Sequence, residues 1–167
     1  MHRTKTMWTM LAAVMVTACM MATTDAAEKR ALPAFALTTF DDVTTDSTTS
    51  LGTGTHLLVY VAPGSAPSER LLAAFRQWDS DALRARVLVV FGGSKDDATR
   101  WMTAAGAQLQ PLRYAVDASG DVRRALNLTG APHMIGIADG RIEWALSGVL
   151  NDPQMMESVV RTWIARP

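Results

Sequence analysis

The chain has 167 residues, of which 49% are hydrophobic and 19% are charged, and five are tryptophan. This composition is typical of one folded domain with a substantial core, and it excludes a disordered chain. Sixteen basic and sixteen acidic residues give a formal net charge of zero. No basic stripe or zinc-ligand pattern is present, so nothing predicts nucleic-acid binding.

The first 18 residues have the pattern of an export signal. A basic start with Arg3 and Lys5 precedes an uncharged, mostly apolar run from Met7 to Ala18. Twelve helical residues span only about 18 Å, less than the roughly 30 Å of a membrane core, so this run is too short for a membrane-spanning anchor. We predict that residues 1–18 are a signal peptide.

The only cysteine of the chain, Cys19, follows that signal directly. The sequence Val16-Thr17-Ala18-Cys19 resembles the bacterial lipobox, which implies cleavage before Cys19 and attachment of lipid to it. Two or more acyl chains hold a protein stably on a membrane. We therefore expect a membrane-anchored lipoprotein on the periplasmic side of the cell envelope, with residues 19–32 as a lipid-anchored tether. The alternative is ordinary cleavage near Ala26, which would leave a soluble periplasmic protein.

The folded region is expected to span residues 33–167 and to begin with a short strand at Pro33–Leu37. The segment Asp41–Thr55 is rich in Thr, Ser, Asp and Gly, which predicts a loop or a weak hairpin. Leu57–Val61 is a continuous apolar run, which indicates a central buried strand. A helix follows, and its apolar face consists of Leu71, Leu72, Phe75 and Trp78.

A second buried strand is predicted at Val87–Phe91. The helix after it can be capped by Ser94 and ends near Ala105, with Trp101 in the core. A short strand at Tyr114–Val116 and a short helix at Asp121–Leu126 come next.

The last part of the chain predicts a hairpin and a helix. Asp139-Gly140 is a tight-turn signal between strands at Met134–Ala138 and Arg141–Leu146. The final helix begins with Asp152 as its cap and Pro153 at its first position. Its predicted apolar face consists of Met156, Val159, Val160 and Trp163. Alternating strands and helices that end in a hairpin and a helix predict an α/β fold, with a mixed sheet and helices on both faces.

Four short stretches, in this order and spacing, resemble the extracytoplasmic TlpA-like redoxins. Pro33–Leu37 is similar to the family's P-x-F-x-L entry, and Leu57–Ala62 is similar to the strand before its active site. Asn127–Pro132 is similar to the family's v-x-G-x-P loop, and Ile135–Ile142 is similar to its D-G-x-I hairpin. The resemblance covers about residues 33–165 and implies a thioredoxin-like fold with Pro132 in the cis form. The stretches LLVYVAPGSAPSERLL and SGVLNDPQMMESV are also similar to the methylamine-utilisation accessory protein MauD. That likeness implies help in maturing a disulfide-rich quinoprotein dehydrogenase.

The sequence departs from this family at the active-site motif. The family's C-x-P-C falls on Ser65-Ala66-Pro67-Ser68, where Pro67 fits and both cysteines are serines. Thiol–disulfide exchange needs a thiolate, which serine cannot supply, so we expect a redox-inactive, degenerate site. Ser65 is expected to cap the following helix with its hydroxyl, and the alternative is a polar binding patch at the helix start.

The remaining candidate site is a groove beside the cis-proline. The resemblance implies that extended peptides bind there through main-chain hydrogen bonds, a mode that needs no cysteine. The expected partner is an exported protein or an assembly partner. The predicted groove consists of Tyr60, Ala62, Pro63, Gly64, Pro67, Ala131, Pro132 and His133.

Two other functions stay open at this point. Ser65 and His133 could form a hydrolase-like catalytic pair, although the chain has no G-x-S-x-G elbow. The domain could also be a structural lipoprotein without a ligand. No cofactor and no metal site is predicted, because His56 and His133 are the only histidines after the signal and neither belongs to a short-spaced ligand motif.

Overall fold

The computed structural model describes residues 30–78, 81–105, 112–149 and 152–167. Within these ranges, eight strands form one sheet. The strands are β1 (Arg30–Ala31), β2 (Ala36–Thr38), β3 (Thr44–Asp46), β4 (Thr55–Val61), β5 (Val87–Gly92), β6 (Arg113–Asp117), β7 (His133–Ala138) and β8 (Arg141–Ser147).

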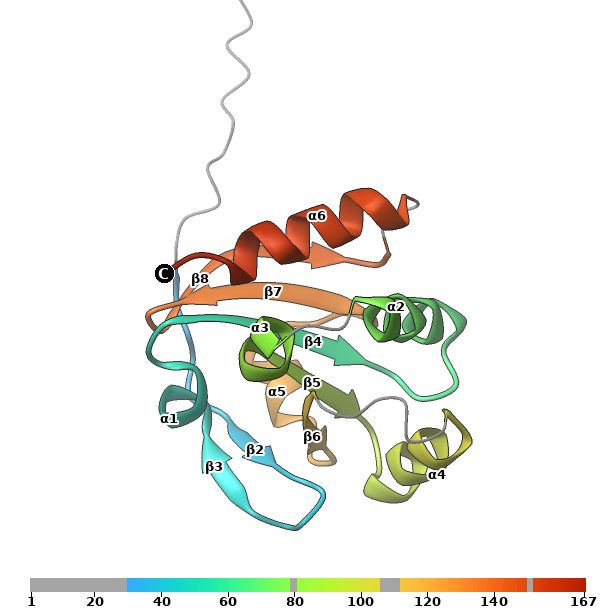
Figure 1. Ribbon diagram of the computed structural model, residues 1–167. Coiled ribbons are helices and arrows are strands. Elements are labelled where there is room, and N and C mark those ends of the chain that lie inside the picture. The colour runs from blue at the N-terminus through green and yellow to red at the C-terminus, as the bar shows by residue number, and fades with distance from the viewer. Residues whose placement is uncertain (1–29, 79–80, 106–111, 150–151) are drawn as a thin grey trace, which may run out of the picture.

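The strands lie side by side in the order β1-β8-β7-β4-β5-β6-β2-β3 (Figure 1). β4, β5 and β6 run parallel to one another, while β7 is antiparallel to β4, and β8 is antiparallel to β7. The sheet is therefore mixed, as the sequence predicts.

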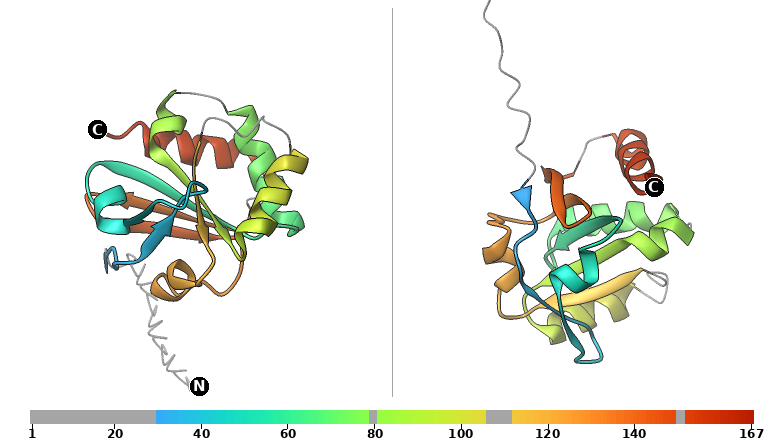
Figure 2. Two further views of the ribbon diagram at one scale, coloured as in Figure 1. Left: turned by 90° about the horizontal axis from the view of Figure 1, so that it is seen from below. Right: turned by 90° about the vertical axis from the view of Figure 1, so that its left-hand side faces the viewer.

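Six helices within the described ranges cover both faces of the sheet (Figures 1 and 2). On one face, α2, α3, α4 and α6 contribute buried side chains to the same core as β4, and on the other face α1 and α5 do so. The helices are α1 (Ser47–Leu51), α2 (Ala66–Gln77), α3 (Asp81–Arg86), α4 (Lys95–Ala105), α5 (Asp121–Ala125) and α6 (Pro153–Ile164).

Strand β4 is apolar along nearly its whole length because both of its faces are covered. Successive side chains of a strand point to opposite faces of the sheet. Leu57, Val59 and Val61 accordingly pack on the α2 and α6 side, whereas Leu58 and Tyr60 pack on the α5 side. This alternation determines which face of the sheet each side chain of β4 points to, up to the end of the strand beside the candidate site.

The folded domain starts earlier than the predicted boundary at residue 33. Strand β1 pairs with β8, and the Leu32 amide donates to the Gly140 carbonyl at 2.8 Å. Leu32 is buried in the core beside α5. The end of the predicted tether, residues 30–32, therefore belongs to the sheet, because Leu32 supplies apolar surface to the core. Residues 1–18 and Cys19 lie outside the described residues.

The segment Asp41–Thr55 holds more structure than a loop or weak hairpin. β3 pairs antiparallel with β2, and the short helix α1 follows it directly. The Asp46 carboxylate caps this helix by accepting from the Thr48 amide at 2.7 Å, and Leu51 is fully buried. A run of Thr and Ser has low helix propensity, so one cap and one buried leucine decide the outcome.

Helix α6 begins as predicted and differs from the prediction at one position. The Asp152 carboxylate accepts from the Gln154 amide at 2.9 Å, and Pro153 occupies the first turn. Val159, a predicted member of the apolar face, is 38% exposed because it lies at the flank of the buried stripe. That stripe consists of Met156, Val160, Trp163 and Ile164.

Candidate functional site

The segment Ser65–Ser68, predicted to be a degenerate active-site motif, lies where β4 ends and α2 begins. Gly64 has a φ of 76°, a left-handed conformation that glycine adopts without steric cost, and this turn leads the chain into the helix. Ser65 occupies the N-cap position of α2, as predicted, but its hydroxyl makes no capping hydrogen bond. The expected role of that hydroxyl is therefore wrong. Pro67 lies in the first turn, where its missing N–H leaves no helix bond unmade.

Ser68 is the structurally engaged serine of the motif. Its side chain is buried, and its Oγ accepts a hydrogen bond from the Ala62 amide at 3.1 Å. This bond ties the end of β4 to the first turn of α2. Ser68 therefore holds the shape of the segment and is not part of an open polar patch.

This difference between the two serines gives a matched pair of variants. Replacing Ser68 with alanine is expected to lower the free energy of unfolding by about 1–2 kcal/mol, because the Ala62 amide loses its acceptor. Replacing Ser65 with alanine is expected to change it by less than about 0.5 kcal/mol. Urea unfolding followed by circular dichroism measures both, and equal losses would contradict the assignment.

The peptide bond between Ala131 and Pro132 is cis, as the resemblance implies. The register pairs His133 with Tyr60, so Ala131 comes beside the end of β4 near Ala62. The Pro132 carbonyl accepts from the Gly148 amide at 2.8 Å, which fixes this loop to the end of β8. Among the described residues, the amide and carbonyl of Ala131 have no hydrogen-bond partner. One short stretch of backbone at this edge is thus open to pairing.

His133 lies outside the groove, contrary to the prediction. Its side chain is only 7% exposed, and its Nδ1 lies 2.9 Å from the Ser147 hydroxyl on β8. Alternation along β7 directs it to the face opposite Met134, which packs in the core beneath α2. Burial lowers the pKa of His133, which favours the neutral imidazole. In the described part of the chain no hydrogen bond joins it to Ser65, so the hydrolase-like pair is not formed.

Tyr60 is also buried and does not form a wall of the groove. It is 5% exposed, and its hydroxyl donates to a carboxylate oxygen of Asp117 at 3.3 Å. Burial, together with the charge and the hydrogen bond of Asp117, raises the pKa of Tyr60 to about 12. The phenol therefore stays protonated across the physiological range.

Asp117 is a structural centre that the sequence reasoning missed. Its buried carboxylate accepts from Tyr60 and from the amides of Val122 and Arg123, both at 3.0 Å. It thereby caps α5 from the end of β6 and joins that helix to β4. An aspartate at a strand end, followed by Ser119 and Gly120 before a helix, is the local signal that could have indicated the cap.

A cavity of about 420 Å³ lies beside the motif on the side of α4. Three of the predicted groove residues, Ala62, Pro63 and Gly64, line it, whereas Ala131, Pro132 and His133 do not. The other lining residues are Gly92, Asp97, Arg100 and Trp101. The Trp101 indole N–H donates to the Glu69 carboxylate at 3.4 Å, which places the ring between α4 and α2. This cavity beside Ala62, Pro63 and Gly64 thus faces α4, a direction that the sequence did not predict.

The charged residues at the rim of this cavity, Asp97 and Arg100, lie near the start of α4. The Asp97 amide donates to the Ser94 hydroxyl at 3.1 Å, which confirms Ser94 as the cap. The Ser94 hydroxyl and, more weakly, the Arg100 guanidinium lower the pKa of Asp97, and Arg100 forms an ion pair with it. Both charges of the rim are therefore already paired with each other.

The sequence matches no protein-family model and no curated protein. Several solved structures do match the fold. A candidate thiol:disulfide interchange protein DsbE from Chlorobium tepidum has a TM-score of 0.67 at 18% identity, over 82% of this chain and 97% of its own. The exposed lipoprotein thioredoxin Etrx1 of Streptococcus pneumoniae has a TM-score of 0.60 at 18% identity, over 77% and 98%.

A third match is a secreted disulfide oxidoreductase of Mycobacterium tuberculosis that is homologous to DsbE of E. coli. Its TM-score is 0.63 at 14% identity, over 77% of this chain and 95% of its own. Matches of this kind show that the chain has a thioredoxin-like α/β fold, which confirms the predicted fold class. Within the described ranges, no helix has the length and apolar character needed to cross a membrane.

Proposed function

We propose that this chain is a redox-inactive, thioredoxin-like domain of the cell envelope that binds an extended segment of an exported protein or assembly partner. The observation that carries the proposal is the unpaired backbone of Ala131 beside the cis-Pro132 bond. Strand-like peptides add to exposed backbone edges through main-chain hydrogen bonds, and neighbouring pockets select their side chains. The groove proposed here consists of Ala62, Pro63, Gly64 and Ala131, and the buried Pro132 shapes it from beneath through its cis bond.

In this proposal the cavity towards α4, which shares Ala62, Pro63 and Gly64 with the groove, supplies its side-chain pocket. Its wall combines Pro63 with the partly buried Trp101, an amphipathic ring that suits a protein interface. Because Asp97 and Arg100 neutralise each other on the rim, the pocket favours an uncharged or apolar side chain. A peptide that pairs with Ala131 and places one such side chain against Trp101 is the expected ligand.

The residues at the motif support the proposed absence of redox chemistry. Cys19 is the only cysteine of the chain, and neither Ser65 nor Ser68 can form a mixed disulfide. Lipid attachment at Cys19 would hold the domain on the periplasmic face of a membrane. The matched S. pneumoniae protein is itself an exposed lipoprotein, which agrees with a location in the cell envelope. The likeness to MauD suggests one narrower partner, a disulfide-rich quinoprotein dehydrogenase during maturation.

Site-directed photocrosslinking in the native envelope tests the proposal. His133 is buried, so the photoreactive residue is placed at the exposed Thr129, within the cis-proline loop. The matched control is the exposed Thr162 on α6. We expect a discrete adduct from position 129 only, and a weaker one when Trp101 is replaced by alanine. The same adducts from both positions, or none from position 129, would favour a structural lipoprotein without a ligand.

A further inference from the structure

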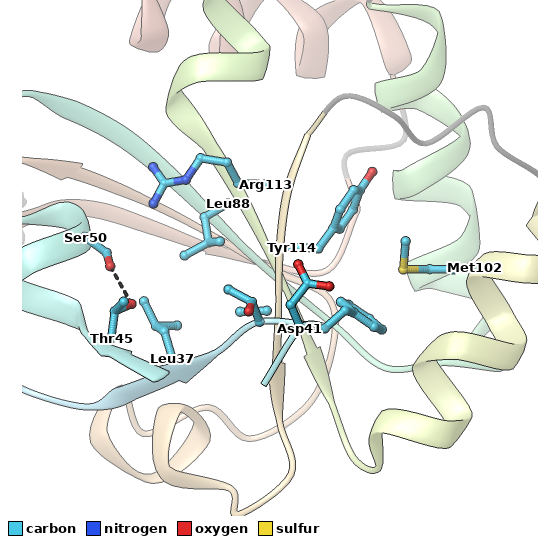
Figure 3. Close-up of a pocket in the computed structure, with 11 residues that line it drawn as sticks. Leu37, Asp41, Thr45, Ser50, Leu88, Met102, Arg113 and Tyr114 are labelled. Carbon is cyan, nitrogen blue, oxygen red and sulfur yellow. Dashed lines mark hydrogen bonds between the residues drawn. The ribbon is translucent and has the colours of Figure 1, made fainter. Parts of the chain in front are cut away.

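A second cavity lies between the β2–β3 hairpin and β6, on a different part of the sheet (Figure 3). β2 pairs with β6 at one position only, Thr38 with Val116, and the following residues diverge from β6. The hollow left beside the first half of β6 has a volume of about 420 Å³. That size falls within the roughly 300–1,000 Å³ of small-molecule sites.

Arg113 lines this cavity as a half-buried cation without a counter-charge. Within the described ranges no carboxylate forms an ion pair with it, and this includes Asp41, which lines the same cavity. Burial lowers the pKa of the Arg113 guanidinium. Burial is also the main cause that lowers the pKa of His56, and the positive charge of Arg113 lowers it further. A cation that is partly removed from water without a partner costs stability, so the position is suited to an anion.

Apart from Asp41, the rest of the cavity wall is apolar with a few hydroxyl groups. Leu37 and Leu88 form its apolar floor, and the hydroxyls of Thr45 and Ser50 lie 2.9 Å apart at its edge. Arg113 extends to the side on which these hydroxyls lie, while Tyr114 points the other way (Figure 3). A ligand that fits must therefore have one anionic end and one apolar body.

We propose that this cavity binds a small organic monocarboxylate whose carboxylate lies against Arg113 and whose apolar body packs on Leu37 and Leu88. The planar guanidinium offers two parallel N–H donors, a geometry that matches a carboxylate. The carboxylate of Asp41 disfavours a second acidic group in the same cavity. This site is separate from the cis-proline groove and does not depend on the function proposed for it.

Calorimetry and NMR on the full chain test this site with 3-phenylpropionate as the probe. We expect saturable binding with a Kd of about 1 mM or tighter and a shift of the Arg113 Nε–H resonance. Arg113→Gln is expected to weaken binding at least about tenfold, while Arg70→Gln, which removes an equal charge from the exposed surface of α2, leaves it unchanged. Circular dichroism confirms that both variants are folded.

Three comparisons make the result decisive. The neutral 3-phenylpropanol and inorganic phosphate are each expected to bind at least about tenfold more weakly than the probe, since each lacks one half of the required chemistry. Glutarate is expected to bind more weakly than the probe and to gain affinity in Asp41→Asn. Absence of saturable binding at about 10 mM probe, equal binding by Arg113→Gln, or equal binding of phosphate would overturn the proposal.

Discussion

Replacing Asp117 with alanine is expected to lower the free energy of unfolding by about 3 kcal/mol or more, as measured by urea denaturation. The buried carboxylate accepts hydrogen bonds from Tyr60 and from the amides of Val122 and Arg123. Each buried donor that is left without a partner costs about 1–3 kcal/mol, and the substitution leaves two of them, Tyr60 and the Val122 amide, together with the partly buried Arg123 amide. No other single side chain described here joins β4, β6 and α5.

Two variants control this experiment. Asp121→Ala removes an exposed carboxylate from the same helix start and is expected to cost less than about 1 kcal/mol. Asp117→Asn keeps one acceptor oxygen and is expected to lie between the two. In this asparagine variant the pKa of Tyr60 should fall from about 12, because the charge of Asp117 is gone. If Asp117→Ala were no more damaging than Asp121→Ala, the proposed role of the carboxylate would be wrong.

The raised pKa of Tyr60 also predicts the direction of an alkaline transition. The folded state holds the neutral phenol more strongly than the unfolded chain, whose tyrosine titrates near about pH 10. The contribution of Tyr60 to the free energy of unfolding is therefore complete below about pH 10, and it is lost as the pH rises towards the folded-state pKa of about 12.

The double substitution of Ser65 and Ser68 by cysteine is expected to create dithiol chemistry where the unchanged chain has none. A cysteine at the N-cap of α2 has its thiol pKa lowered by the helix start, and the buried position 68 supplies the resolving thiol. The double variant should reduce insulin with dithiothreitol as the electron source, while each single variant stays at background. Maleimide labelling before and after dithiothreitol counts the thiols that form the new disulfide.

Each outcome of that experiment addresses a different claim. Dithiol-dependent activity in the unchanged chain would overturn the proposed redox inactivity. Failure of the double variant to form a disulfide would show that the segment has lost the geometry of the motif as well as its cysteines. Activity in the double variant alone would show that the two serines are what prevents thiol–disulfide exchange in the unchanged chain.

The central strands and the cis-proline could be predicted because their signals are local. β4 and β5 are apolar runs covered on both faces, and Ala131-Pro132 belongs to a short recognisable loop. The direction of His133 could not be predicted in the same way. Alternation sets it opposite Met134, but the sequence does not say which face of β7 the helix α2 covers.

The polar contacts of the site were the least predictable part, because they depend on residues far apart in the chain. Tyr60 and Asp117 are 57 positions apart, and only the packed sheet brings them together. Ser65 and Ser68 both lie at the start of α2, and the preference for serine at the N-cap position favours Ser65 as the capping residue. The position of the Ala62 amide decides instead that Ser68 is the bonded serine.

The pairing of β1 with β8 has a consequence for how the domain is presented to its surroundings. Arg30 enters the sheet two residues from the β7–β8 turn, whereas Ala131 lies before the opposite end of β7. The six residues of β7 separate these two ends by about 20 Å. A tether upstream of Arg30 would therefore attach the domain to a membrane near the β7–β8 turn. The groove proposed at Ala131, at the opposite end of β7, would then face away from that membrane.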